Sequence, residues 1–200
     1  MVFVSGRSRR RLEAVAQTLG ASGVLPEMGA TDAGYPTEPG ETVHDAIART
    51  GVPEALLAAE PGLAPHPLAV WGREGSHVFL GLVGPGADAL VDRLSGGLLR
   101  LADNGHTGPD GAHIFHLLPA AASKAAAVAR DIAARGADPA ACLAVGDSGQ
   151  DLGMGRVLGT VAIVANGAAA DPEVAAAAPW VTAGSYGAGV LEAVEAWLSR

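Results

Sequence analysis

The sequence predicts an α/β protein built on a parallel sheet, with a second, α+β segment inserted between two parts of the chain that form the sheet. Three observations support this class. Short apolar runs alternate with helical stretches near both ends of the chain, two of these runs lead into glycine and polar residues, and residues 31–111 change to short pieces separated by Pro and Gly. Strands that alternate with helices form parallel sheets. We therefore expect a core of residues 1–30 and 112–200 and a cap of residues 31–111.

The first part of the chain predicts a strand at residues 2–4, a helix at 9–19 and a strand at 23–25. In the helix, Leu12, Val15, Ala16 and Leu19 recur at the spacing of one helical face. In the central segment, apolar runs predict strands at 77–83 and 98–102, with a helix at 87–94 between them. We expect these elements to form the cap.

From residue 112 onward, strands and helices alternate again. Apolar runs predict strands at 113–118, 142–145 and 160–164, and the stretches between and after them predict helices at 123–135, 150–158 and 187–198. Short apolar runs of this kind are typical of parallel strands covered on both faces. We expect the core sheet to resume here.

Two carboxylates follow the strand predicted at 142–145. The segment Val145-Gly146-Asp147-Ser148-Gly149-Gln150-Asp151 places Asp147 directly after the strand and Asp151 in the first turn of the next helix. Open α/β folds bind their ligands at the carboxyl ends of the strands. Carboxylates on a short loop suit Mg²⁺, which completes its coordination with water and phosphate oxygens. A turn with an Asp helix cap is the alternative for an isolated Gly-Asp pair.

Lys124 is the one lysine of the chain, against twelve arginines. It stands at the start of the helix predicted at 123–135. An ammonium is a compact point charge, which can hold a phosphate and a carboxylate together. A solvated lysine at the start of a helix is the alternative.

A third polar feature follows the first strand. Val4-Ser5-Gly6-Arg7 leads from the apolar run into the first helix. The hydroxyl of Ser5 and the neighbouring N–H groups are suited to a phosphoryl oxygen at the start of a helix. Ser and Gly after a strand also form ordinary turns.

Taken in order, these three segments resemble the motifs of the haloacid dehalogenase (HAD) superfamily of phosphohydrolases. The similarity extends over nearly the whole chain and is greatest to the branch with a large α/β cap, which includes sugar-phosphate and mannosyl-phosphoglycerate phosphatases. Residues 26–30 stand where these relatives enter the cap, and residues 163–167 resemble their strand after the metal motif. The resemblance implies a Rossmann-like core with an inserted cap.

The resemblance also implies roles for single residues. Ser5 and Gly6 would bind the transferring phosphoryl group, and Lys124 would neutralise charge on it and on the nucleophile. Asp147 would ligate Mg²⁺ directly, and Asp151 would orient the metal or its water. The implied substrate is a small phosphorylated metabolite, such as a sugar phosphate.

The nucleophile of the family has no match in the sequence. HAD phosphatases carry Asp-x-Asp-Gly-Thr on their first strand, upstream of the serine motif, and form an aspartyl-phosphate on its first Asp. The segment around Asp32 lacks a second Asp and a preceding strand. We expect an N-terminal truncation that leaves the first core strand missing, so that the chain alone turns over poorly. The strands at 2–4 and 143–145 should then leave a gap or contact each other.

Four further residues are candidates for supporting roles. Arg73 and Asn104 lie in loops of the predicted cap and could reach a sugar hydroxyl or a second anion. His116 is a candidate substrate contact, with a structural histidine as the alternative. Asn166 follows a core strand, and we expect its amide to support the metal loop.

Composition excludes several classes of protein. A net charge of −8 disfavours nucleic-acid binding, which needs a basic face. No apolar segment is long enough to span a membrane, and the run at residues 1–4 is too short for a signal peptide. Cys142 is the one cysteine, so the chain has no disulfide of its own. We expect a cytoplasmic location.

Three functions remain open at this stage. The first is a Mg²⁺-dependent phosphatase of a small metabolite, and the second is a catalytically silent module that binds phosphate and Mg²⁺. The third is an unrelated nucleotide-binding α/β domain. Gly149, Gly153 and Gly155 do not have the Gly-x-Gly-x-x-Gly spacing of a dinucleotide-binding loop, which disfavours the third.

Overall fold

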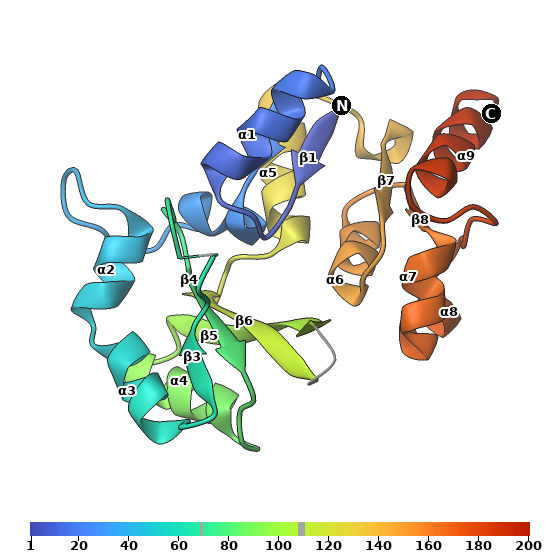
Figure 1. The fold of residues 1–200 in the computed structure, drawn as a ribbon. Coiled ribbons are helices and arrows are strands. Elements are labelled where there is room, and N and C mark those ends of the chain that lie inside the picture. The colour runs from blue at the N-terminus through green and yellow to red at the C-terminus, as the bar shows by residue number, and fades with distance from the viewer. Residues whose placement is uncertain (69, 108–110) are drawn as a thin grey trace. The chain divides into compact units, whose positions relative to one another are not determined.

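The computed structural model describes residues 1–68, 70–107 and 111–200 (Figure 1). The chain divides into two compact units, Met1–Ala122 and Ser123–Arg200. The strands form a two-stranded and a four-stranded sheet in the first unit and a two-stranded sheet in the second. Among the described residues, no helix is both long and apolar enough to cross a membrane.

The first unit opens with the predicted strand, helix and strand. These are β1 (Val2–Val4), α1 (Arg9–Thr18) and β2 (Gly23–Leu25). β1 and β2 pair in parallel, with Phe3 opposite Val24. The helix buries Leu12 and Ala16, which lie on the face that the sequence pattern indicated.

The rest of the first unit is an antiparallel sheet with helices on one face (Figure 1). The strand order is β3-β4-β6-β5. Its strands are β3 (Leu63–Pro65), β4 (His77–Gly81), β5 (Leu99–Thr107) and β6 (Ala112–Pro119). Its helices are α2 (Val43–Arg49), α3 (Val52–Ala59) and α4 (Ala87–Ser95).

The two faces of this sheet have different neighbours. One face packs against the three helices in a core that includes Ile47, Leu56, Val91 and Phe115. The opposite face forms a smaller core of residues from β5, β6, the turn after β6 and the segment after β2: Met28, Ala30, Ala102, Leu118 and Ala122. The segment after β2, η1 (Glu27–Asp32), therefore packs against the sheet of the cap.

The predicted boundary between cap and core is wrong at residue 112. We assigned the strand after this boundary to the parallel core, but β6 pairs antiparallel with both β4 and β5. The pattern of strand followed by helix suggested a core repeat, because β6 is apolar and precedes α5 (Lys124–Arg135). An apolar strand in the middle of an antiparallel sheet has the same composition.

The second unit alternates strands and helices as predicted. After α5 come β7 (Leu143–Gly146), α6 (Gly149–Leu152) and β8 (Thr160–Ile163). The chain ends with α7 (Ala165–Ala170), α8 (Pro172–Ala177) and α9 (Tyr186–Leu198). β7 and β8 pair in parallel, and Ile163 forms a parallel bridge to Val181. Two short 3-10 segments, η2 (Pro139–Ala141) and η3 (Gly153–Arg156), join these elements.

The strands β1 and β7 each have one open edge. In the part of the chain that the structure describes, β1 has β2 as its one strand partner, and β7 has β8. An unpaired strand edge exposes backbone N–H and C=O groups. The expectation of a missing core strand stays a prediction.

Candidate functional site

The loop between β7 and α6 is organised by the buried carboxylate of Asp151. One carboxylate oxygen, Oδ2, accepts the N–H groups of Asp147 and Ser148, each at 3.2 Å, and the hydroxyl of Ser148 at 2.7 Å. Ser148 is the N-cap of α6, so Asp151 reaches back to the cap residue as in a capping box. The carboxylate thus fixes the backbone of the residues that precede it.

The other carboxylate oxygen of Asp151 binds Lys124. Lys124 Nζ donates to Asp151 Oδ1 at 2.7 Å, and the two side chains are only 11% and 7% exposed. Lys124 is the first residue of α5. A cation at this position is repelled by the positive end of the helix dipole. Asp151 compensates this charge, so Lys124 is not the solvated lysine of the alternative interpretation.

Gly146 is required by the position of the Asp151 side chain. A Cβ atom at residue 146 would lie 2.2 Å from Asp151 Cβ. Gly167, at the start of α7, has a similar role, because its Cβ would lie 2.4 Å from the carbonyl oxygen of Asp147. Glycine at these two positions lets the acidic loop pack closely against its surroundings.

Asp147 is the carboxylate that fits a metal ion. Its side chain is exposed and has no hydrogen-bond or ionic partner among the described residues, whereas Asp151 already accepts four hydrogen bonds. Within the described part of the chain, no three His, Cys, Asp or Glu side chains cluster in a way that could hold a metal. Mg²⁺ needs only one or two protein carboxylates when water and phosphate fill the other positions.

The loop after β1 presents the hydroxyl of Ser5. Ser5 Oγ accepts the N–H of Arg7 at 3.2 Å, and the carbonyl of Ser5 accepts the N–H of Met28 at 3.0 Å. A Cβ atom at Gly6 would lie 3.2 Å from both His116 Cε1 and Met28 Cε, so glycine allows close packing here. Ser5 and Gly6 therefore lie in a tight loop that contacts Met28 in η1 and His116 on β6.

The side chain of Arg73 is buried against the loop after β1 and does not lie on the surface of the cap. We expected it to reach a substrate, but its side chain is 4% exposed, and Nη1 donates to the carbonyl of Gly6 at 2.6 Å. The buried carboxylate of Glu27 lies 3.7 Å from the same nitrogen. Burial lowers the pKa of Arg73, and the charge of Glu27 opposes this shift.

The other supporting candidates have different surroundings. His116 is buried on β6 and packs against Gly6, on the face of β6 opposite to His113. Asn104 is exposed on β5, where the register with β6 shifts. The side-chain oxygen of Asn166 accepts the N–H of Tyr186 at 2.7 Å. The neighbouring Gly167 closely approaches the backbone of Asp147, and a supporting role of Asn166 stays a prediction.

Sequence reasoning missed Glu27. Its carboxylate is fully buried and accepts the N–H groups of Glu74 and Gly75 and the hydroxyl of Ser76. A signal was present, because Glu27 stands in the otherwise apolar and glycine-containing stretch at residues 23–30. A charged residue in such a stretch is rarely buried unless it is paired.

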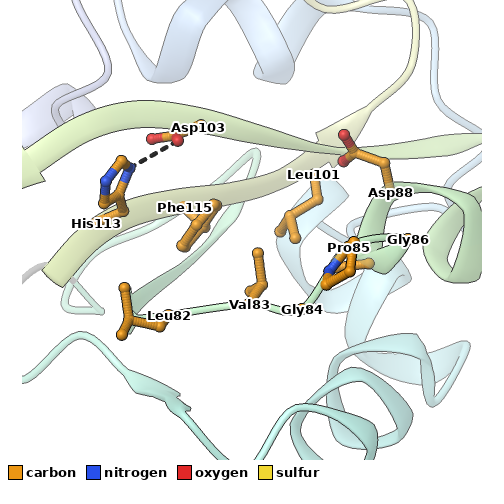
Figure 2. A pocket seen from close by; sticks show the side chains of 11 residues that line it. Leu82, Val83, Gly84, Pro85, Gly86, Asp88, Leu101, Asp103, His113 and Phe115 are labelled. Carbon is orange, nitrogen blue, oxygen red and sulfur yellow. Dashed lines mark hydrogen bonds and ion pairs between the residues drawn. The ribbon is translucent and has the colours of Figure 1, made fainter.

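A pocket of about 400 Å³ lies on the helix-covered side of the cap sheet. Figure 2 shows Asp103 and His113 joined at one end, Leu101 and Phe115 in the floor, and Asp88 at the other end. The carboxylates of Asp88 and Asp103 disfavour an anion. The lining of this pocket therefore does not suit a phosphoryl group.

Known proteins share both the sequence pattern of the C-terminal half and the fold of the chain. Residues 100–194 match the family model for haloacid dehalogenase-like hydrolases. Protein 0175 of Thermoplasma acidophilum superimposes with a TM-score of 0.70 at 19% identity, over 100% of this chain and 83% of that chain. Residues 100–194 are thus similar to the haloacid dehalogenase-like hydrolases.

Two further solved structures share the fold of this chain. The sucrose-phosphatase from Synechocystis sp. PCC6803, in complex with sucrose and phosphate, has a TM-score of 0.66 and 18% identity, over 98% of this chain and 83% of that chain. A phosphatase of the haloalkanoate (HAD) enzyme superfamily from Bacteroides thetaiotaomicron has a TM-score of 0.68 and 16% identity, over 100% and 82%. No curated protein matches the chain in sequence.

Proposed function

We propose that this HAD-like chain carries the machinery of a Mg²⁺-dependent phosphatase of a small phosphorylated metabolite, such as a sugar phosphate. The observation that carries the proposal is the contact of Lys124 with Asp151, next to the open carboxylate of Asp147. It combines a nearly buried cation and an acidic loop at the carboxyl end of a parallel strand. A cation and a metal ligand side by side suit the equatorial oxygens of a phosphoryl group.

In this proposal each residue has a separate task. Asp147 would hold Mg²⁺, which supplies charge stabilisation for the phosphoryl oxygens. Lys124 neutralises a phosphoryl oxygen, and Asp151 holds Lys124 and the loop in place. Ser5 and the N–H of Gly6 bind another phosphoryl oxygen. The proposed substrate class is supported by the structural neighbour that is named as a sucrose-phosphatase.

A second function, phosphate binding without turnover, is favoured by one observation. The sequence has no Asp-x-Asp-Gly-Thr segment. Transfer through an aspartyl-phosphate needs a carboxylate in line with phosphorus. The residues named above bind phosphate in either case, so binding and turnover have to be measured separately.

The test measures both quantities on the full chain. We expect inorganic phosphate to bind with Mg²⁺ present, and we expect Ser5→Ala, Lys124→Met and Asp147→Asn each to weaken binding by about tenfold or more, the loss of one charge-assisted contact. Arg135→Met is the control, because Arg135 pairs with Asp131 on an exposed face of α5. Wild-type affinity in all three site variants would reject both functions.

Turnover distinguishes the two functions. Hydrolysis of a panel of sugar phosphates, measured as released phosphate, would establish the phosphatase. Binding without hydrolysis would favour the silent module for the chain as it stands. The codons immediately upstream of Met1 supply a further check, because an in-frame Asp-x-Asp segment would restore the phosphatase interpretation and a stop codon would not.

A further inference from the structure

We propose that Arg73 is a positioning residue that orients the hydroxyl of Ser5 through one peptide group, an inference that rests on the proposed role of Ser5 in binding phosphate. Arg73 lies in the loop before β4, far from Ser5 in sequence. Its guanidinium donates to the carbonyl of Gly6 at 2.6 Å. This contact is the first of three that connect Arg73 to the hydroxyl of Ser5.

The second link follows from the geometry of the peptide bond. The carbonyl of Gly6 and the N–H of Arg7 belong to the same peptide group, and the described part of the chain has no cis peptide bonds. In a planar trans peptide the C=O and N–H vectors point in opposite directions. Arg73 therefore fixes the direction of the Arg7 N–H when it binds the Gly6 carbonyl.

The third link is the contact of that N–H with the hydroxyl. Arg7 N donates to Ser5 Oγ at 3.2 Å. A hydroxyl has one donor and two acceptor sites, so an incoming N–H leaves the O–H of Ser5 to donate elsewhere. The hydroxyl is thereby prepared to donate to an acceptor such as a phosphoryl oxygen.

Two backbone contacts support the same orientation. Met28 N donates to the carbonyl of Ser5 and Glu27 N donates to the carbonyl of Arg7, both at 3.0 Å. The carbonyls of three consecutive residues are thus bound by residues from the segment after β2 and from Arg73. By the same planarity, the bond at the Ser5 carbonyl directs the Gly6 N–H to the opposite side.

Glu27 holds Arg73 in the position that this arrangement needs. Its fully buried carboxylate lies 3.7 Å from Arg73 Nη1. It also accepts the N–H groups of Glu74 and Gly75 at 2.9 and 3.1 Å, so it binds the residues that follow Arg73 in the chain. Glu27 and Met28 have φ values of +51° and +57°, a strained conformation that this network stabilises.

An arginine suits this position better than a lysine. A guanidinium presents several N–H donors in a rigid plane, so it can contact a carboxylate and a carbonyl together. An ammonium is smaller and lacks this fixed geometry. Arg73→Lys should therefore retain part of the orienting effect on the Ser5 loop, and Arg73→Met should retain none of this effect.

The experiment combines phosphate affinity with a local readout at Arg7. The variants of the full chain are Arg73→Met, Arg73→Lys and Ser5→Ala, and the probe is inorganic phosphate with Mg²⁺ in calorimetry. Hydrogen exchange of the Arg7 amide, followed by NMR, reports the orientation of the loop without any ligand. Arg9→Met is the matched control, because Arg9 binds Glu74 of the same loop at 2.9 Å but at a part-exposed site.

We expect Arg73→Met to weaken phosphate binding by about tenfold and to speed exchange of the Arg7 amide by a similar factor, the effect of one lost hydrogen bond to a charged group. Arg73→Lys should fall between Arg73→Met and wild type in both quantities. Arg9→Met should change both by less than about threefold, as for an exposed ion pair. The rescue by lysine distinguishes positioning from a general loss of stability.

The outcomes separate this inference from the proposed function. If Ser5→Ala leaves phosphate affinity unchanged, the proposed role of Ser5 fails, and the Arg7 amide still reports whether Arg73 orients the loop. If Ser5→Ala weakens binding while Arg73→Met changes neither affinity nor exchange, the inference about Arg73 is overturned. If Arg73→Met does not fold, Arg73→Lys decides: wild-type values for both affinity and exchange overturn the inference.

Discussion

At the scale of single residues, the site in the second unit depends on Asp151, whose two carboxylate oxygens both accept hydrogen bonds from neighbouring residues. Asp151 accepts hydrogen bonds from Lys124, Asp147 and Ser148. Its part in the candidate metal site is therefore to hold other groups, whereas Asp147 keeps an open carboxylate. Proximity of two carboxylates in sequence could not assign these roles, because both were equally placed to bind a metal.

The Lys124–Asp151 pair leads to a prediction about stability. Lys124→Met should lower the free energy of unfolding by about 3 kcal/mol, because it removes one partner of a nearly buried ion pair. Arg135→Met on the same helix breaks the more exposed pair with Asp131 and should cost less than about 1 kcal/mol. Urea unfolding followed by circular dichroism measures both. Equal losses in the two variants would contradict the inferred difference in burial.

A second prediction concerns the glycine next to Asp151. Gly146→Ala should lower the free energy of unfolding by about 1–3 kcal/mol, because the new Cβ overlaps the Asp151 side chain and must displace it. Gly153→Ala is the control: φ is −55° and no atom lies within 4 Å of the added Cβ. It should stabilise the chain by about 0.4–1 kcal/mol. A stabilised Gly146→Ala variant would show that Asp151 is not held as described.

At the scale of elements, the start of α5 combines a helix cap with the residue proposed to bind phosphate. The hydroxyl of Ser123 accepts the N–H of Ala126 at 3.0 Å, and Lys124 follows directly. The sequence predicted this helix to within one residue, because the cap, the alanine-rich body and Gly136 at its end are local signals. The cap sets the position from which the lysine side chain extends.

This arrangement predicts an effect of the cap on stability. Ser123→Ala should lower the free energy of unfolding by about 1 kcal/mol, since one N–H of the first turn loses its acceptor. Ser185 is the N-cap of α9 but makes no capping hydrogen bond through its side chain, so Ser185→Ala should change stability by less than about half of that. Thermal unfolding of both variants tests the difference, which disappears if Ser123 does not act as a cap.

Several elements were not predictable from their sequences. The alanine-rich helices α7 and α8 lack an apolar stripe, because nearly all of their residues are small, so hydrophobic periodicity does not predict them. Pro and Gly around α2 and α3 suggested loops, although Pro53 stands in the first turn of α3, where proline is favourable. The predicted strand at 77–83 ends earlier, at Gly81, which has a φ of +145° and closely approaches Gly62.

At the scale of the whole molecule, stability should depend on a partly buried histidine in the cap. His77 stacks on His44 with ring centroids 3.9 Å apart, and its Nε2 donates to the carbonyl of His44 at 3.0 Å. Burial, with a smaller contribution from the neighbouring His44, lowers the pKa of His77 to about 4. The folded state therefore keeps His77 neutral in a pH range where the unfolded chain binds a proton.

The sign of the pH effect follows from this difference. Below pH 6.5, the pKa of His77 in the unfolded chain, the unfolded state binds a proton that the folded state does not bind. The free energy of unfolding therefore falls as the pH decreases toward about 4. Between pH 7 and 4.5, His77 should account for a loss of about 2–3 kcal/mol. Urea unfolding of the wild type and of His77→Gln at both pH values measures it. The same loss in both proteins would contradict the inferred pKa.

The α/β class, the order of the three polar motifs and the signals of helix caps and glycines can be predicted from the sequence, because each depends on neighbours within a few residues. Three other features depend on the three-dimensional fold: the pairing of β6 within the cap sheet, the burial of Arg73 against Glu27, and the hydrogen bonds that occupy both oxygens of Asp151. The physical reason is that strand partners and buried charges are selected by contacts between residues distant in the chain. Composition and periodicity do not encode those contacts.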